Sequence, residues 1–176
     1  MPTMTLLPDG TVLNIGWVAN TGTVHDALDD DNDDTSYVNS TVNSQRIILD
    51  FANPTVAEGD IDFSAGISIR FTSSGRCPAR DASNAGSDVT IKFQTPFGFD
   101  ETINYFNNAN YETENGTART TKPDSSAWEY SDLEDLQMRC TKNGTAAVRL
   151  SYVAFEVTYT EAVVAADNAI FFGANF

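Results

Sequence analysis

Apolar and polar residues alternate along most of this chain, and a period of two is typical of a strand with one buried face. Clusters of Gly, Pro, Asn and Ser separate the alternating runs and mark turns. Short strands joined by frequent turns predict an all-β fold, an antiparallel β-sandwich. The alternating runs occupy residues 13–17, 47–51, 63–71, 89–93, 97–105 and 148–159.

The last of these runs contains a change of phase. Its apolar side chains hold even positions from Val148 to Tyr152 and odd positions from Val153 to Tyr159. A shift of one residue turns the buried face of a strand over, so we predict a β-bulge near Tyr152 and Val153. A strand buried on both faces, as at the centre of an oligomer, is the alternative.

Two segments have the pattern of single-turn helices. Residues 23–28 follow the first predicted strand, and Ser131 with Glu134 fits a capping box in which Ser131 is the N-cap. The second helix must end within a turn or so, because residues 137–141 have the pattern of a strand. We therefore expect one or two single-turn helices in an otherwise β structure.

Length and composition indicate one domain. A chain of 176 residues with 41% hydrophobic content can bury a core without disulfides or metals. We assign residues 1–160 to a single β-sandwich domain and residues 161–176 to an apolar C-terminal arm, which needs a surface to lie on. The candidate contact residues of the arm, with an oligomer or another partner, are Val163, Val164, Ile170, Phe171, Phe172 and Phe176.

The chain is strongly acidic, with 25 Asp and Glu against 10 Lys and Arg and a formal net charge of −15. Such a surface repels phosphate backbones and anionic lipids, so neither nucleic acid nor a membrane is an expected partner. The first residues lack the basic segment and apolar run of a secretory signal, so we expect synthesis in a cytosol. Cys77 and Cys140 match no metal or redox spacing; we expect free thiols, with a disulfide as the alternative.

The densest group of ligand-type side chains is acidic. Six aspartates fall within residues 26–34, and Asp29, Asp31 and Asp33 form an Asp-x-Asp-x-Asp run of hard oxygen donors that suits Ca²⁺. The glycine and the distant glutamate of an EF-hand loop are absent. The alternative is a solvated acidic turn whose carboxylates cap local amides. Calcium is the one cofactor that the sequence puts forward.

No pattern of residues indicates catalysis. His25 is the sole histidine, without a nucleophile elbow or a Cys–His signature. The carboxylates within residues 129–135 are better explained by helix capping than as a glycosidase pair. Trp17, Trp128 and Tyr130 are candidates for a sugar-stacking platform, but we expect them on buried strand faces. The sequence therefore predicts a protein that is not an enzyme.

Several short fragments follow one another in a familiar order over roughly residues 10–160. They are Gly16 with Trp17, residues 25–29, 33–38 and 67–71, Trp128, and residues 132–138 and 149–159. This series resembles the small jelly-roll-like virion proteins of tailed bacteriophages. The resemblance implies a jelly-roll-like sandwich in the virion, assembled in the host cytoplasm, with the major capsid protein or other virion proteins as partners. It implies no catalytic residue.

Together these observations predict a non-enzymatic structural subunit of a bacteriophage virion. The most specific form of this expectation is a capsid decoration or cement protein on the head surface that forms a homo-oligomer, taken as a trimer. The alternative is a carbohydrate- or receptor-binding β-sandwich module of a tail or fibre.

Overall fold

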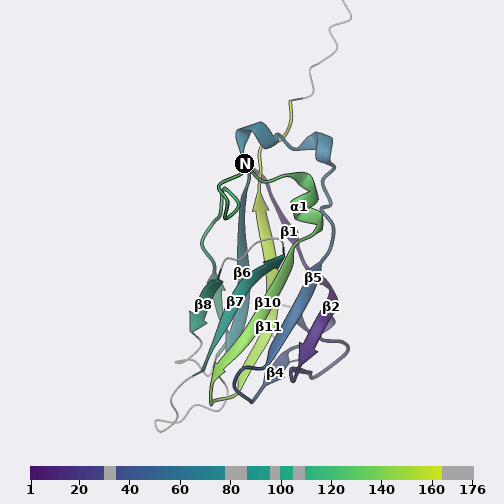
Figure 1. Ribbon diagram of the computed structural model, residues 1–176. Helices are drawn as coiled ribbons and strands as arrows, with labels where there is room; N and C mark the ends of the chain where they lie inside the picture. The colour runs from purple at the N-terminus through teal and green to yellow at the C-terminus, as the bar shows by residue number, and fades with distance from the viewer. Residues whose placement is uncertain (30–34, 78–86, 96–99, 105–109, 164–176) are drawn as a thin grey trace, which may run out of the picture.

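Two antiparallel sheets stack face to face in the computed structural model, which describes residues 1–29, 35–77, 87–95, 100–104 and 110–163 (Figure 1). One sheet has the strand order β3-β4-β11-β6-β9, with β1 also beside β11, and the other has the order β2-β5-β10-β7-β8. Successive strands such as β9, β10 and β11 alternate between the sheets. The predicted all-β, jelly-roll-like sandwich is confirmed.

The elements have the following bounds. The six-stranded sheet contains β1 (Thr3–Leu6), β3 (Val18–Ala19), β4 (Val38–Ser40), β6 (Ser68–Arg76), β9 (Glu112–Asn115) and β11 (Val148–Thr158). The five-stranded sheet contains β2 (Pro8–Ile15), β5 (Arg46–Phe51), β7 (Ser87–Thr95), β8 (Asp100–Asn104) and β10 (Gln137–Gly144). The helical turns are η1 (Asp26–Leu28), η2 (Glu58–Asp60), η3 (Phe63–Ala65) and α1 (Tyr130–Glu134). Within the described ranges, no helix has the length and apolar character needed to cross a bilayer.

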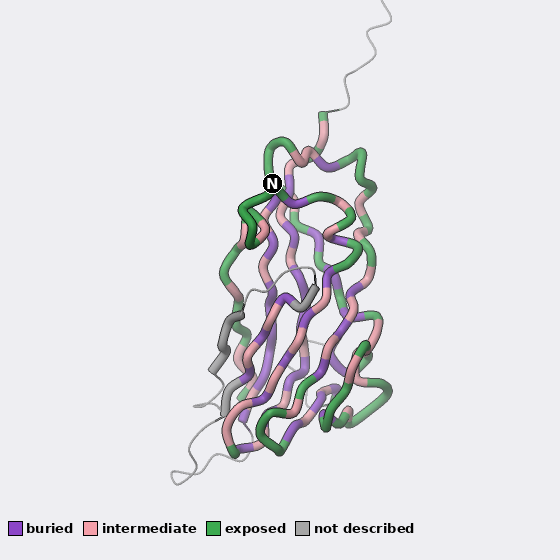
Figure 2. The backbone as a smooth tube through the Cα atoms, viewed as in Figure 1, coloured by how far each residue is buried: buried purple, intermediate pink, exposed green. Residues whose placement is uncertain are grey.

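An aromatic cluster joins the two sheets at the centre of the core. Phe51 and Phe93 come from the five-stranded sheet, and Phe71 and Phe155 come from the six-stranded sheet. The ring centroid of Phe155 lies 4.6 Å from that of Phe51 and 4.8 Å from that of Phe93. Buried positions follow the strands and exposed positions gather in the loops (Figure 2). The alternating pattern of β5, β7 and β11 therefore produces the core as predicted.

The phase change in the last strand is a β-bulge. The pairing of β11 with β6 shifts register between Leu150 and Tyr152. Leu150 before the shift and Val153 and Phe155 after it are all fully buried. The predicted bulge is confirmed, because the extra residue lets both phases of the apolar pattern face the same core.

The prediction of one strand over residues 63–71 is wrong in its first half. Residues Phe63–Ala65 form the helical turn η3, because Asp62 Oδ1 accepts hydrogen bonds from the backbone N–H groups of Ser64 and Ala65 at 2.9 and 3.2 Å. Gly66 then takes a φ of +82°, and β6 begins only at Ser68. A local cap thus overrides the alternating pattern.

The predicted buried face at Leu13, Ile15 and Trp17 is also wrong at one position, because the side chain of Ile15 is 44% exposed. The pairing of β2 with β5 is irregular at two points, between Pro8 and Gly10 and between Thr11 and Leu13. These irregularities change which face of β2 points inward. Trp17 is nevertheless buried, as expected, after the turn that follows β2.

The short helix before β10 exists, but its predicted cap is wrong. Helix α1 begins at Tyr130 with Glu129, and not Ser131, as its N-cap. Asp132 occupies the N3 position, and its carboxylate accepts a hydrogen bond from the backbone N–H of Glu129 at 2.8 Å. Trp128 and Tyr130 therefore lie at a helix start rather than on one strand face, although Trp128 is buried as expected.

Both cysteines are buried free thiols, as predicted. Burial raises the pKa of Cys140 from 9.0 to about 12, because the apolar surroundings disfavour the charged thiolate. The thiolate is the reactive form.

We expect Cys140 in the native chain at pH 8 to resist a soluble aromatic disulfide reagent and to react once guanidinium unfolds the chain. The same raised pKa contributes stability that is complete below pH 9 and is lost as the pH rises toward 12. Rapid reaction of both thiols with the reagent in the native protein would contradict the expected protection of Cys140.

The chain starts and leaves the sandwich at the same end (Figure 1). Thr3 in β1 lies opposite Thr158 in β11, and the backbone N–H of Tyr159 donates to the carbonyl of Pro2. After β11 the backbone N–H of Ala162 donates to the carbonyl of Asp60. Of the predicted contact residues of the arm, only Val163 is described. Val164, Ile170, Phe171, Phe172 and Phe176 lie outside the described residues.

Candidate ligand-binding face

The outer face of the six-stranded sheet carries two arginines directly opposite each other. Arg149 in β11 pairs with Arg76 in β6. Val148 and Leu150, on either side of Arg149, are fully buried, so Arg149 points away from the core. Directly paired residues share a face, so Arg76 points the same way.

Each of these arginines contacts a tyrosine ring. The guanidinium carbon of Arg149 lies 4.2 Å from the ring centroid of Tyr37, just before β4, and that of Arg76 lies 5.0 Å from the centroid of Tyr111, just before β9. Tyr37, Arg149, Arg76 and Tyr111 therefore form a line across four neighbouring strands, here named the Tyr–Arg row. All four residues are half-buried.

The backbone beneath the Tyr–Arg row is held in place on both sides. The side-chain oxygen of Asn20 accepts a hydrogen bond from the backbone N–H of Tyr37 at 2.7 Å, and the backbone N–H of Asn20 donates to the Tyr37 carbonyl at 3.0 Å. On the other side, Glu112 pairs with Gly75 and fixes the residue next to it, Tyr111. The two arginines lie on paired strands and the two tyrosines lie one residue before paired strands, so the row is more rigid than a site on loops.

The Tyr–Arg row can bind a flat, hydroxyl-rich or carboxylate-bearing molecule. A guanidinium presents five N–H donors in a fixed plane and accepts no hydrogen bonds. Tyrosine adds an apolar ring face together with a hydroxyl. Arg and Tyr are also the residues most enriched where proteins recognise partners. The row is thus the strongest candidate binding surface in the described part of the chain.

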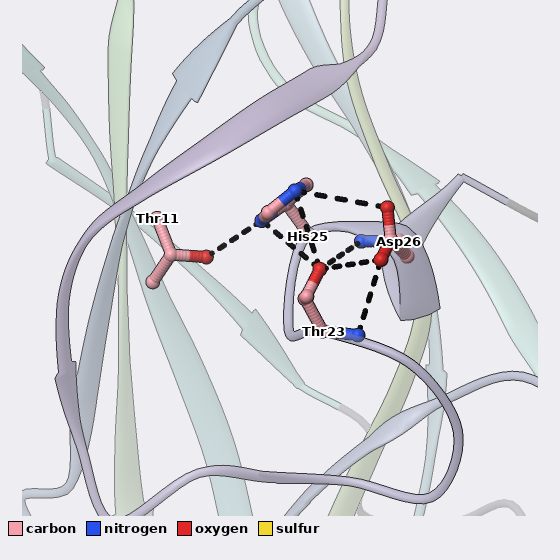
Figure 3. Close-up of polar contacts among 4 residues, drawn as sticks. All are labelled: Thr11, Thr23, His25 and Asp26. Carbon is pink, nitrogen blue, oxygen red and sulfur yellow. Dashed lines mark hydrogen bonds and ion pairs between the residues drawn. The ribbon is translucent and has the colours of Figure 1, made fainter.

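Figure 3 shows a second polar cluster around the sole histidine. His25 Nδ1 lies 3.1 Å from Thr11 Oγ1, and His25 Nε2 lies 3.6 Å from Asp26 Oδ1. The Thr23 hydroxyl donates to Asp26 Oδ2 at 2.6 Å, and the backbone N–H of Thr23 donates to the same oxygen at 3.1 Å. These hydrogen bonds, led by the one from the Thr23 hydroxyl, lower the pKa of Asp26.

The geometry of this cluster does not suit nucleophilic catalysis. A nucleophilic hydroxyl must give its proton to the histidine, which an acid then orients. Here the Thr23 proton is directed at Asp26 instead. Thr23 and Asp26 also belong to one tight turn that leads into η1. We interpret the cluster as a turn that fixes η1 beside β2.

The candidate calcium ligands are only partly described. Asp29 is exposed, and its backbone forms a bridge to Tyr152 in β11. Asp31 and Asp33 lie outside the described residues, so the calcium site stays a prediction. Among the residues that the structure describes, no group of three His, Cys, Asp or Glu side chains is arranged to hold a metal.

The tryptophan platform considered from the sequence does not exist on the surface. Trp17 and Trp128 are each only 2% exposed, and the Trp128 indole N–H donates to the Arg119 carbonyl at 3.0 Å. The Tyr–Arg row was not predicted as a site. Its one signal in the sequence is Arg149, an arginine at an outward position of the apolar run 148–159; Arg76 follows Ser73, Ser74 and Gly75, which have the pattern of a turn.

No protein-family model and no curated protein matches this sequence. Among solved structures, the chain is similar to a family GH115 4-O-methyl-α-glucuronidase with specificity for decorated arabinogalactans (9% identity, TM-score 0.42), covering 86% of this chain and 18% of that enzyme. It is also similar to the CBM22-1 xylan-binding domain of Paenibacillus barcinonensis Xyn10C, with 13% identity, a TM-score of 0.39, and 89% and 94% of the two chains covered.

A third similar structure is the N-terminal cellulose-binding domain of Cellulomonas fimi β-1,4-glucanase C, at 14% identity and a TM-score of 0.33. That match covers 84% of this chain and 91% of the cellulose-binding domain. All three TM-scores are below 0.5. The assignment of the fold therefore rests on the strands and their pairing in this chain.

Proposed function

We propose that this chain is a non-enzymatic β-sandwich module that binds a carbohydrate, such as a receptor glycan, on the Tyr–Arg row. One observation carries the proposal. Two arginines lie directly opposite each other on the outer face of a sheet, each against a tyrosine ring, in the order Tyr37, Arg149, Arg76 and Tyr111.

The chemistry of the row supports a sugar rather than an apolar ligand. Hydroxyl and carboxylate oxygens match the planar N–H donors of Arg76 and Arg149. The rings of Tyr37 and Tyr111 offer apolar faces on which the C–H groups of a sugar ring can pack. The chain has a net charge of −15, and the two guanidinium groups of the row lie on adjacent strands, so they offer local positive charge to a carboxylate-bearing sugar.

Titration calorimetry with a panel of oligosaccharides tests this proposal. The panel contains neutral xylo- and cello-oligosaccharides and acidic uronic-acid oligosaccharides. We expect at least one member to bind, and we expect Arg149→Ala and Tyr37→Ala to weaken that binding by about tenfold or more, equivalent to about 1.4 kcal/mol.

Arg139→Ala is the matched control. Arg139 is also a half-buried strand arginine, but it pairs with Ile48 and Lys92 on the five-stranded sheet. Its replacement removes the same charge while leaving the row intact, so the affinity should not change. Absence of binding to every oligosaccharide, or an equal loss in Arg139→Ala, would show that the row is not a glycan site.

A structural role in a bacteriophage virion is the second candidate, and a specific observation favours it. The fragments that resemble virion proteins include the Arg149-bearing strand, and an apolar segment follows Val163, whose side chain is 93% exposed. Locating the chain in an imaged particle tests this role. A particle that assembles with full occupancy of all other subunits and no density for this chain would exclude it. In a tail or fibre the two candidates coincide.

A further inference from the structure

A small hollow lies at the end of the sandwich where the chain leaves. Its volume is about 230 Å³, below the range of about 300–1,000 Å³ that is usual for small-molecule sites. It suits one or two side chains of a peptide. The hollow is lined by Met1, Ala65, Gly66, Ile67, Ser68, Thr120 and Thr158, none of which carries a charged side chain.

None of the residues that the structure describes fills the hollow. Gly66 has no atom within 4 Å of the position that a Cβ would take, and Ala65 and Thr120 are exposed. Its floor is Ile67, which is 3% exposed and belongs to the hydrophobic core. An apolar side chain entering here would therefore extend the core outward.

The residues that follow Val163 have the composition to fill it. Residues 164–176 contain Ile170, Phe171, Phe172 and Phe176 and a single charged side chain, Asp167. Fully extended, thirteen residues reach about 43 Å. In a chain of net charge −15, a hollow without acidic side chains and a tail with a single acidic side chain are surfaces on which two copies repel each other little.

The direction in which the chain leaves favours a neighbour over the same molecule. The last described residues rise away from the end of the sandwich (Figure 1). Ala162 is held to Asp60 by a backbone hydrogen bond, and Val163 is 93% exposed. At Val163 the described chain is therefore held clear of its own sandwich, where a second molecule can meet it.

We propose that the hollow between η3 and β11 binds residues 164–176 of a second copy of this chain, so that the copies associate by exchanging tails. This site is independent of the Tyr–Arg row, which lies at the other end of β11. Aromatic side chains buried in a pocket are frequent anchors of protein interfaces. Exchange of a terminal segment joins identical chains with little new surface.

Sedimentation velocity of the full chain over a range from about 5 to 200 µM tests the proposal, a range that brackets the micromolar affinities of weak interfaces. We expect concentration-dependent oligomers. Thr120→Trp, which fills the hollow, and the double variant Phe171→Asp with Phe172→Asp, which charges the tail, should each weaken self-association at least tenfold. Ala65→Arg provides a second change to the hollow should Thr120→Trp fail to fold, as judged by circular dichroism.

Thr145→Trp is the matched control, because Thr145 is an exposed threonine at the opposite end of the sandwich, between β10 and β11. Its oligomers should equal those of the wild type. A wild-type monomer at every concentration overturns the proposal, and so do oligomers that persist in both the hollow and the tail variants. Glycan binding by the same variants should be unchanged, which separates this result from that of the Tyr–Arg row.

Discussion

Replacing Phe155 with alanine is expected to lower the free energy of unfolding by about 3–5 kcal/mol. Phe155 is fully buried and lies between Phe51 and Phe93, with ring centroids 4.6 and 4.8 Å away. Truncation removes two of the ring contacts between the two sheets and leaves a cavity that rigid strands cannot close. Most small domains have only about 5–15 kcal/mol of stability, so this one change consumes a large part of it.

Chemical denaturation followed by tryptophan fluorescence measures this loss, since Trp17 and Trp128 are both buried. Phe155→Leu is the matched control, because it keeps the site apolar and most of its volume; its cost should be clearly smaller. A loss below about 1 kcal/mol for Phe155→Ala would mean that the aromatic cluster does not hold the sheets together.

Gly116→Ala is expected to cost about 1–3 kcal/mol, although it adds only a methyl group. A Cβ at this position would lie 2.3 to 2.7 Å from three ring atoms of Phe71. Phe71 cannot move aside easily, because it is fully buried and its ring lies 6.5 Å from that of Phe93. The backbone of Gly116 is also fixed, since its N–H donates to the Phe71 carbonyl at 2.9 Å.

Gly59→Ala supplies the comparison. Gly59 lies in the turn η2, and a Cβ there would meet no atom within 4 Å. The added methyl group should be neutral or should stabilise by up to about 1 kcal/mol, because alanine restricts the unfolded chain. Thermal unfolding of the two variants side by side measures the difference; equal melting temperatures would show that Phe71 gives way to the methyl group.

The sequence predicts this fold best where burial is decided by the strand itself. Ile47, Leu49 and Phe51 alternate with polar residues, and the structure buries all three. The bulge in β11 was predictable for the same reason, because the apolar residues change from even to odd positions within one continuous segment. A strand with one solvent-exposed face can be recognised from its own alternating pattern, without reference to distant residues.

The helix cap shows where local rules give two answers. Glu129 with Asp132 and Ser131 with Glu134 have the same spacing, and serine is the better N-cap by preference alone. A residue outside the segment favours the observed choice: Lys122 Nζ donates to Asp132 Oδ2 at 2.8 Å. That contact holds Asp132 at the start of the helix.

Lys142 contradicts the usual expectation for a charged residue. It continues the inward positions of Met138 and Cys140 on β10 and is fully buried. Its ammonium group donates to the Gly144 carbonyl at 2.7 Å. The alternation along β10 points this position inward, but only the backbone at the end of β10 supplies the acceptor that lets a lysine occupy it.

The Tyr–Arg row could not be predicted for a related reason. Its members come from four segments spread between Tyr37 and Arg149, and strand pairing alone brings them into line. A sequence shows which residues of one strand share a face. It does not show which residue of another strand lies opposite, and the row depends on that register.

The pairing of β1 with β11 also decides how the domain responds to mechanical load. Thr3 and Thr158, the outer ends of the two strands, lie opposite each other. A force that pulls the two ends of the chain apart acts across this antiparallel ladder, whose hydrogen bonds run perpendicular to the strands. The hydrogen bonds then break one after another from Thr3 toward Leu6, so each bond carries the full load in turn and the bonds do not share it. The domain should therefore unfold at low force when stretched between its ends, however well its core resists heat.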